Sequence, residues 1–304
     1  MLSLNIKNET SRLKAVILGI ANSNGPTPKI EDAYDPKSKM HIENGTYPIE
    51  ADMISEMDEV AQVLKKYDVH VFRPQLIQNY NQIFSRDIGF VIEDKFIRAN
   101  ILPDREQEIE AIHHIIDQID PEKVIVLPEH CHIEGGDVMP HGDFIFVGTY
   151  LGKDYSSFIT ARTNTEAVAA LQELFPYKTI KAFNLRKDNN DPKENALHLD
   201  CCFQPVGSKY AIIHENGFLN PDDFNWLVQF FGEENVFKID KDEMFNMTSN
   251  IFSIAEDVVI SDKRFSRLNQ WLTERNIIVE TVNYKEIAKQ EGLLRCSTLP
   301  LIRE

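Results

Sequence analysis

A chain of 304 residues, 42% hydrophobic and 26% charged, has the composition of a soluble globular protein with a substantial core. Its formal net charge of −16, without a lysine- or arginine-rich block, excludes nucleic acid and anionic membranes as favoured partners and suits a small cationic ligand. No apolar run approaches the roughly 18 residues of a membrane span, and the N-terminus lacks the pattern of a secretion signal, so we expect a cytoplasmic protein. The composition leaves open whether the chain forms a homo-oligomer.

The N-terminal region combines two apolar strands with one amphipathic helix. We expect strands at 14–18 and 69–72, and between them a helix whose apolar face carries Ile54, Met57, Val60, Ala61 and Leu64. The polar segment from Ala21 to Pro48 interrupts this unit. A segment of that length in a compact domain is usually a lid, a binding loop or a disordered stretch.

The remainder of the chain repeats one pattern four times. Each copy has two short β-rich runs around a polar turn, then an amphipathic helix, then a short β-branched strand. The expected hairpins span 88–99, 137–147, 202–213 and 251–261, and the closing strands span 123–127, 179–183, 235–239 and 277–280. The first of the four helices is expected from about Asp104 through Ile116, and the third is expected to bury Phe224, Leu227, Phe230 and Phe231.

The N-terminal unit lacks half of its hairpin, and the C-terminal run Leu299-Pro300-Leu301-Ile302 can supply that half. Pairing of the two chain ends would close five ββαβ units into a ring without a free sheet edge. We therefore predict an α/β protein with the architecture of a five-bladed α/β-propeller of pseudo-fivefold repeats. Residues 1–304 would form a single domain.

The four cysteines, Cys131, Cys201, Cys202 and Cys296, form no C-x-x-C pair, and we expect reduced thiols. Cys201 and Cys202 are expected to point to opposite faces of a strand. The best candidate for a metal site is His130-Cys131-His132 with Glu134 and His141. No second cluster of ligands accompanies it, so we expect neither a metal nor a cofactor.

Chemically reactive residues precede the hairpins. They are Ser85-Arg86-Asp87, Glu134-Gly135-Gly136-Asp137, His198-Leu199-Asp200, the segment from Asn246 to Asn250, and Cys296 before the last strand. Around a pseudo-fivefold axis these positions are equivalent and lie on one rim. A cysteine, a histidine and several carboxylates would then meet at one centre.

Those residues together suit chemistry on a guanidinium group. Cys296 is the candidate nucleophile, His198 can act as general acid and base, and Glu134 can orient the imidazole. Asp87 and Asp200 would repel each other unless a cation lay between them, and a planar guanidinium matches carboxylates in bidentate geometry. Attack of the thiolate on the guanidinium carbon would expel an amine and leave a covalent amidino-thioether, which water would hydrolyse.

At these motifs the chain resembles the guanidine-modifying enzymes, which include arginine deiminases, dimethylarginine dimethylaminohydrolases and amidinotransferases. The resemblance rests on Phe84-Ser85-Arg86-Asp87, Glu134-Gly135-Gly136-Asp137, His198-Leu199-Asp200 and Arg295-Cys296-Ser297-Thr298-Leu299-Pro300-Leu301. It covers nearly the whole chain and implies the pentein fold, with Cys296 as nucleophile, His198 and Glu134 as the acid/base pair, and Asp87 and Asp200 as guanidinium ligands. It also implies Arg162 as the ligand of a substrate α-carboxylate.

One departure from the resemblance concerns the segment before the cysteine. Deiminases usually carry a glycine-rich loop there, whereas this chain has Gln290-Glu291-Gly292-Leu293-Leu294. We predict a hydrolase that cleaves a guanidinium C–N bond of arginine or an arginine derivative. Transfer of the amidino group to an acceptor amine is the runner-up, and a non-catalytic binding module on the same ring is the third hypothesis.

Overall fold

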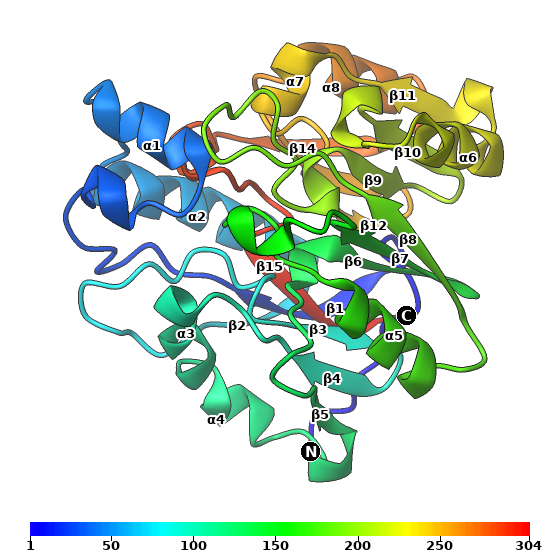
Figure 1. The fold of residues 1–304 in the computed structure, drawn as a ribbon, viewed down its shortest axis with the longest axis horizontal. Helices are drawn as coiled ribbons and strands as arrows, with labels where there is room; N and C mark the ends of the chain where they lie inside the picture. The colour runs from blue at the N-terminus through cyan, green and yellow to red at the C-terminus, as the bar shows by residue number, and fades with distance from the viewer.

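Every sheet of the protein is small and has the same topology. The computed structural model describes residues 1–304 and contains five three-stranded sheets (Figure 1). In each sheet the middle strand pairs antiparallel with one neighbour and parallel with the other. The sheets are, in strand order, β15 (Thr298–Arg303), β1 (Leu13–Leu18) and β2 (His70–Phe72); β3 (Gly89–Ile92), β4 (Lys95–Arg98) and β5 (Val124–Val126); β6 (Val138–His141), β7 (Phe144–Thr149) and β8 (Thr179–Asn184); β9 (Phe203–Val206), β10 (Tyr210–Ile213) and β11 (Val236–Lys238); and β12 (Phe252–Ala255), β13 (Val258–Asp262) and β14 (Ile278–Val282).

Helices connect the middle and parallel strands of each unit and lie toward the outside of the molecule (Figure 1). The α-helices are α1 (Pro36–Glu43), α2 (Glu50–Lys66), α3 (Gln107–Glu110), α4 (His113–Ile116), α5 (Thr165–Leu174), α6 (Pro221–Phe231), α7 (Lys241–Phe245) and α8 (Ser266–Thr273). The 3-10 helices are η1 (Ile30–Asp32), η2 (Pro103–Arg105), η3 (Pro121–Lys123), η4 (Gly135–Asp137), η5 (Tyr155–Ser157), η6 (Leu199–Cys201), η7 (Glu215–Gly217), η8 (Glu233–Asn235) and η9 (Ile287–Gln290). None of the helices is long and apolar enough to cross a membrane.

The two ends of the chain complete one sheet, as predicted from the missing half hairpin. Strand β15 pairs antiparallel with β1, with Leu18 opposite Thr298 and Ile17 opposite Leu299. Both strands are almost entirely buried, so the pairing is fixed by apolar burial as well as by the backbone ladder. The C-terminal strand therefore holds Cys296 against the interior instead of leaving it on a free tail.

The hydrophobic core consists of clusters between successive units. Along the middle strands, alternate side chains contribute to different clusters, because successive residues of a strand point to opposite faces. Val16 joins the cluster shared with the last two units, whereas Ile17 joins the cluster shared with the second unit. Both side chains are fully buried. Each sheet is thus covered on both faces by its neighbours.

Three expectations about the elements need correction. The helix predicted from Asp104 through Ile116 is broken into η2, α3 and α4, with a turn at Ala111 and Ile112 in an isoleucine-rich stretch of modest helix propensity. Phe230 is not core: its side chain is 37% exposed and stacks on Trp226 with ring centroids 5.0 Å apart. Cys201 and Cys202 do not lie on a strand, because Cys201 ends η6 and β9 begins only at Phe203. Of the alternatives left open for the polar segment 21–48, η1 and α1 favour an ordered covering segment.

Candidate active site

The predicted rim residues occupy equivalent places in their units. Glu134 and His198 immediately precede η4 and η6, the short helices that lead into the hairpins β6–β7 and β9–β10. Asp87 lies two residues before β3, and Cys296 lies two residues before β15. Positions far apart in the sequence therefore meet at one buried centre.

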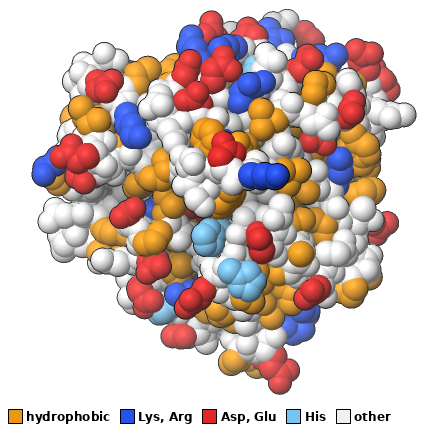
Figure 2. Space-filling model, viewed as in Figure 1, with side chains coloured by type: hydrophobic (Ala, Val, Ile, Leu, Met, Phe, Trp, Pro, Cys, Tyr) orange, Lys and Arg blue, Asp and Glu red, His pale blue; other side chains and the backbone are white.

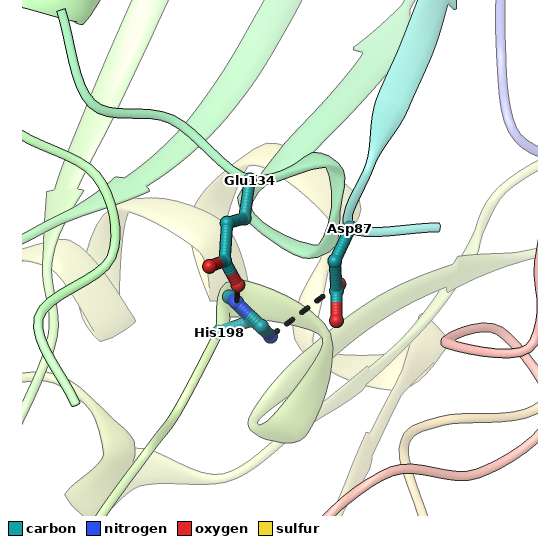
Figure 3. A group of neighbouring side chains, drawn as sticks. All are labelled: Asp87, Glu134 and His198. Atoms are coloured by element: carbon teal, nitrogen blue, oxygen red, sulfur yellow. Dashed lines mark hydrogen bonds and ion pairs between the residues drawn. The ribbon is translucent and has the colours of Figure 1, made fainter. Parts of the chain in front are cut away.

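Glu134, His198 and Asp87 form the core of this centre (Figure 3). The Glu134 carboxylate lies 2.7 Å from His198 Nε2, and Asp87 Oδ1 approaches His198 Nδ1 from the other side at 3.8 Å. Asp87 Oδ1 and His198 Nδ1 are both buried and have no hydrogen-bond partner. Since Asp87 Oδ1 is a buried acceptor without a partner, it indicates a position for a ligand that carries hydrogen-bond donors.

The electrostatics of the centre favour a charged imidazole. Burial opposes the imidazolium, but the carboxylates of Asp87 and Glu134 outweigh it and raise the pKa of His198 to about 9. Burial likewise opposes ionisation of Glu134, but Arg162 and His198 hold its pKa well below the usual range. At neutral pH the pair is therefore an imidazolium and a carboxylate, a proton donor held in a fixed orientation.

Cys296 lies against Asp200 and Asn250. Its Sγ is 3.7 Å from Asp200 Oδ2 and accepts a hydrogen bond from Asn250 Nδ2 at 3.2 Å, and its backbone N–H donates to Asn250 Oδ1 at 3.1 Å. Asp200 Oδ2 also accepts a hydrogen bond from Arg295 Nη1 at 2.8 Å. Asn250 was part of a predicted rim segment without an assigned role, and the structure makes it the direct partner of the thiol.

The thiol is neutral in the protein without a ligand. Burial, and then the negative charges of Asp200 and Asp87, raise the pKa of Cys296 well above its ordinary value. A cation placed between these carboxylates would offset the part of the pKa increase that their negative charges cause. A bound cation would therefore favour the thiolate.

Two arginines flank Glu134, and sequence reasoning found only one of them. Arg162 Nη1 contacts both carboxylate oxygens of Glu134, at 3.1 and 3.2 Å. Arg105, which was not predicted, donates to Asp87 Oδ2 at 2.8 Å and lies 3.8 Å from Glu134 Oε2. The Tyr34 ring packs against both guanidinium groups, at 6.0 Å from Arg105 and 5.7 Å from Arg162. The stretch around Arg105 resembles an ordinary charged helix start, so only a motif at that position could have revealed it.

The Glu-Gly-Gly-Asp motif shapes this centre through its glycine and its second acid. A Cβ atom on Gly136 would lie 2.6 Å from Cγ of His198, so the imidazole can occupy its place only beside a glycine. Asp137 accepts hydrogen bonds from Thr163 Oγ1 at 2.6 Å and from the backbone N–H of Leu199 at 2.9 Å. Asp137 thereby fixes the segment that carries His198.

The segment 21–48 lies against Arg162 of the site and lines one of two neighbouring cavities. Arg162 Nη2 donates to the carbonyl oxygen of Tyr34 at 3.0 Å. A cavity of about 480 Å³ under the segment has Arg105 on its floor, and a second cavity of about 520 Å³ extends to Glu134 and Arg162. Figure 2 shows basic and acidic side chains scattered over the face of Figure 1, without a continuous basic surface. The cavities thus reach Arg105 and the Glu134–Arg162 pair, whereas Asp87, His198 and Cys296 line neither of them.

Apart from Glu134, the residues that could hold a metal are not those weighed from the sequence. Ligand atoms of Asp87, Glu134 and His198 all lie within 4.8 Å of one another. The sequence candidate around Cys131 does not assemble, because Cys131 is buried in the apolar core while the neighbouring His130 and His132 are exposed. Since Glu134 already occupies His198 Nε2, a donor-bearing cation fits the remaining atoms at least as well as a metal ion.

Comparison with known proteins shows the family to which the chain belongs. The model of the family described as "N,N dimethylarginine dimethylhydrolase, eukaryotic" matches residues 30–303. The chain belongs to this family. The uncharacterized protein YkgA of Bacillus subtilis is 31% identical over 223 residues, which cover 73% of this chain and 70% of that protein. The dimethylarginine dimethylhydrolase family is part of the guanidine-modifying pentein superfamily.

Solved structures of low sequence identity share the fold. A saxitoxin-pathway amidinotransferase of Microseira wollei has a TM-score of 0.78 at 15% identity, with 99% of this chain and 98% of that chain covered. An inosamine-phosphate amidinotransferase of Streptomyces griseus has a TM-score of 0.77 at 14% identity, covering 100% and 97%. The DDAH of Pseudomonas aeruginosa, complexed with citrulline, has a TM-score of 0.70 at 17% identity, covering 95% and 100%. The family's α/β fold of five small sheets is thus shared by hydrolases and amidinotransferases.

Proposed function

We propose that the protein is a cysteine-dependent hydrolase of the guanidinium C–N bond of arginine or of an N-methylated arginine, with the five sheets acting as a five-bladed propeller around the site. The observation that carries the proposal is the unpartnered carboxylate oxygen Asp87 Oδ1 next to His198, together with the Cys296 thiol beside the carboxylate of Asp200. A guanidinium supplies positive charge and planar donors that suit these carboxylates.

In the proposed reaction the bound cation activates its own nucleophile. The guanidinium between Asp87 and Asp200 offsets the charges that raise the pKa of Cys296, and the thiol releases its proton to solvent. The thiolate attacks the guanidinium carbon, the C–N bond breaks, and the leaving amine takes a proton from the imidazolium of His198. His198, now neutral, removes a proton from water, and the resulting hydroxide attacks the amidino carbon. The C–S bond then breaks, and the proton that the ureido product gives up restores the thiol of Cys296.

Arg162 suits the far end of an amino-acid substrate, whereas the guanidinium of Arg105 is held by Asp87, Glu108 and the Phe84 carbonyl. Arg162 lies beside Tyr34, and we infer that a substrate α-carboxylate would reach it there. Nη2 of Arg162 donates to the Tyr34 carbonyl oxygen. A substrate carboxylate could bind Nη2 only if it replaced this oxygen or if the segment 21–48 moved away. The family match favours methylated arginine as the first substrate to test.

The decisive experiment is a mass-spectrometric product profile with dimethylarginine, monomethylarginine and arginine, each with and without glycine. We expect citrulline and one equivalent of amine or ammonia per turnover. Guanidinoacetate formed only with glycine would show that the protein is an amidinotransferase and not a hydrolase. Ornithine with two equivalents of ammonia would indicate a dihydrolase. If the protein binds these guanidines but converts none of them, the non-catalytic hypothesis stands.

A further inference from the structure

The segment before the nucleophile carries a buried carboxyl group that the proposed reaction does not use. Glu291 is only 5% exposed and has a left-handed backbone, with φ of 57°. For a residue other than glycine this conformation costs free energy and persists only where surrounding contacts hold it. The chain thus retains a side chain at the place where a glycine would be unstrained.

The Glu291 carboxyl group joins three parts of the active site. Its Oε1 accepts a hydrogen bond from Asn195 Nδ2 at 2.7 Å, three residues before His198. Its Oε2 accepts from the backbone N–H of Lys37, in the first turn of α1, at 3.3 Å. Glu291 itself precedes Cys296 by five residues. A single side chain therefore ties the covering helix to the segments that carry the acid/base residue and the nucleophile.

A second buried carboxyl group, that of Asp35, lies beside it at the N-terminus of α1, where the two accept from the neighbouring backbone N–H groups of Lys37 and Ser38. Asp35 caps the N-terminus of α1 by accepting from the backbone N–H of Ser38 at 2.6 Å, and it is 3% exposed. Two carboxyl groups in contact must share a proton, because two buried negative charges at this distance repel strongly. Burial and Asp35 accordingly raise the pKa of Glu291 to about 8.

Other charged groups surround the pair from each neighbouring element. Lys37 of α1 is buried, its Nζ donates to the carbonyl oxygen of Phe245 at 2.5 Å, and burial lowers its pKa to about 8. Cys201 of η6 also faces Glu291, and Arg264, after β13, acts on Lys37. The lowered pKa of Lys37 affects α1 only above pH 8, so the proton shared by the two carboxyl groups dominates at lower pH.

We propose that Glu291 is a positioning residue whose carboxyl group, beside that of Asp35, latches α1 over the active site and releases α1 when the shared proton is lost to solvent. Docking of α1 by Glu291 does not depend on which reaction the site catalyses. Only its effect on turnover rests on the proposed function. The latched carboxyl group has a pKa of about 8, whereas an exposed one ionises near pH 4.5. Between pH 4.5 and 8, docking of α1 is therefore coupled to the uptake of one proton. The latch is complete below about pH 4.5 and weakens as pH rises to about 8.

Hydrogen exchange of residues 37–43 tests the latch without any substrate. After correction for the intrinsic pH dependence of exchange, protection of α1 in the wild type should fall between pH 5.5 and 8, by up to about tenfold per pH unit. Glu291→Gln, which has no titratable proton, should abolish the pH dependence of this protection, although its amide cannot accept from both Asn195 and the backbone N–H of Lys37. Glu291→Gly, which removes the carboxyl group and relieves the left-handed strain, should leave α1 poorly protected at every pH.

The matched control is Glu43→Gln, which removes an exposed carboxylate at the other end of α1 and should preserve the wild-type slope. Protection of α6 should be independent of pH in all variants. A wild-type α1 whose protection does not change between pH 5.5 and 8 overturns the latch, and so does a slope that persists in Glu291→Gln. Absence of turnover with every guanidine would overturn the proposed function but would leave the exchange result intact.

Discussion

Two buried charge clusters use neighbouring residues of the same short segments, and they differ in which polar atoms have hydrogen-bond partners. In the first, which we call the Glu9 cluster, the carboxylate of Glu9 accepts from Nε and Nη2 of Arg295 at 3.0 and 3.2 Å, and Arg86 Nη1 lies 3.7 Å away. Burial opposes ionisation of Glu9, but the arginines outweigh it and lower its pKa to about 2. Both oxygens of this carboxylate are satisfied by the protein itself.

The second, the His198 cluster, consists of Asp87, Glu134, His198, Arg105 and Arg162. It leaves an oxygen of Asp87 and a nitrogen of His198 without partners. The two clusters are joined in sequence and in space: Arg86 precedes Asp87, and Arg295 precedes Cys296 and bridges Glu9 to Asp200. The Glu9 cluster leaves a donor, Arg86 Nη2, without a partner, whereas the His198 cluster leaves a carboxylate oxygen without one. This contrast indicates that the first cluster holds the segments in place and that the second can take a cation.

The largest expected effect is on the nucleophile. Cys296→Ala should lower kcat by more than about 10⁴-fold while retaining guanidine binding, because it removes the attacking atom and leaves Asp87 and Asp200 unchanged. Cys201→Ala is the matched control, since Cys201 Sγ lies 3.8 Å from the same Asp200 carboxylate and should matter little for turnover. Single-turnover kinetics and isothermal titration measure the two quantities. Preferential loss of activity in the Cys201 variant would contradict the assignment.

Exchanging one carboxylate for an amide in each cluster tests the contrast directly. Glu134→Gln should reduce kcat by about 10²–10⁴-fold, because the imidazolium loses its charged partner. Glu9→Gln should instead destabilise the fold by about 3–5 kcal/mol, because it leaves buried arginines without their counterion.

Urea denaturation and steady-state kinetics on both variants provide the comparison. The distinction between the clusters fails if Glu9→Gln unfolds at the wild-type urea concentration, or if Glu134→Gln keeps full activity. An Asp94→Asn variant serves as control, because Asp94 is a half-exposed carboxylate whose ion pairs should contribute little to stability.

The pH dependence should follow the raised pKa of His198. Turnover that needs the imidazolium as proton donor should fall about tenfold per pH unit above pH 9. The stability linked to this group is complete below pH 6.5, the ordinary value, and is lost as pH rises through about 9. Asp87→Asn removes the leading cause of the increase, so its His198 should titrate closer to neutral pH. Histidine ring signals in NMR report both pKa values, and an unchanged value in the variant would refute this account.

The sequence predicted the fold well because the repeats leave local signals, and it predicted the site only in part. Alternating apolar runs and turns located four hairpins, and the unpaired run at Leu299–Ile302 gave the closing strand. Glu134, His198 and Cys296 were found because each precedes a hairpin in an equivalent position. Arg105 and Glu291 carry no such signal: they lie in ordinary polar stretches, and only tertiary packing buries them.

The smallest expected effect is a change of substrate preference at Arg162. We expect Arg162→Ala to raise KM for arginine about 10–100-fold, as the loss of a charge-assisted hydrogen bond to a carboxylate would. Because Arg162 also holds Glu134 at 3.1 Å, kcat should fall for every substrate, and kcat alone does not report on the carboxylate. The informative quantity is the ratio of kcat/KM for arginine to that for agmatine, which has the same guanidinium but no carboxylate. This ratio should fall in the variant, whereas Glu134→Gln, which perturbs the same pair from the other side, should leave it unchanged. An equal loss for both substrates would mean that Arg162 serves only to hold Glu134, and would move it from substrate recognition to the support of the His198 cluster.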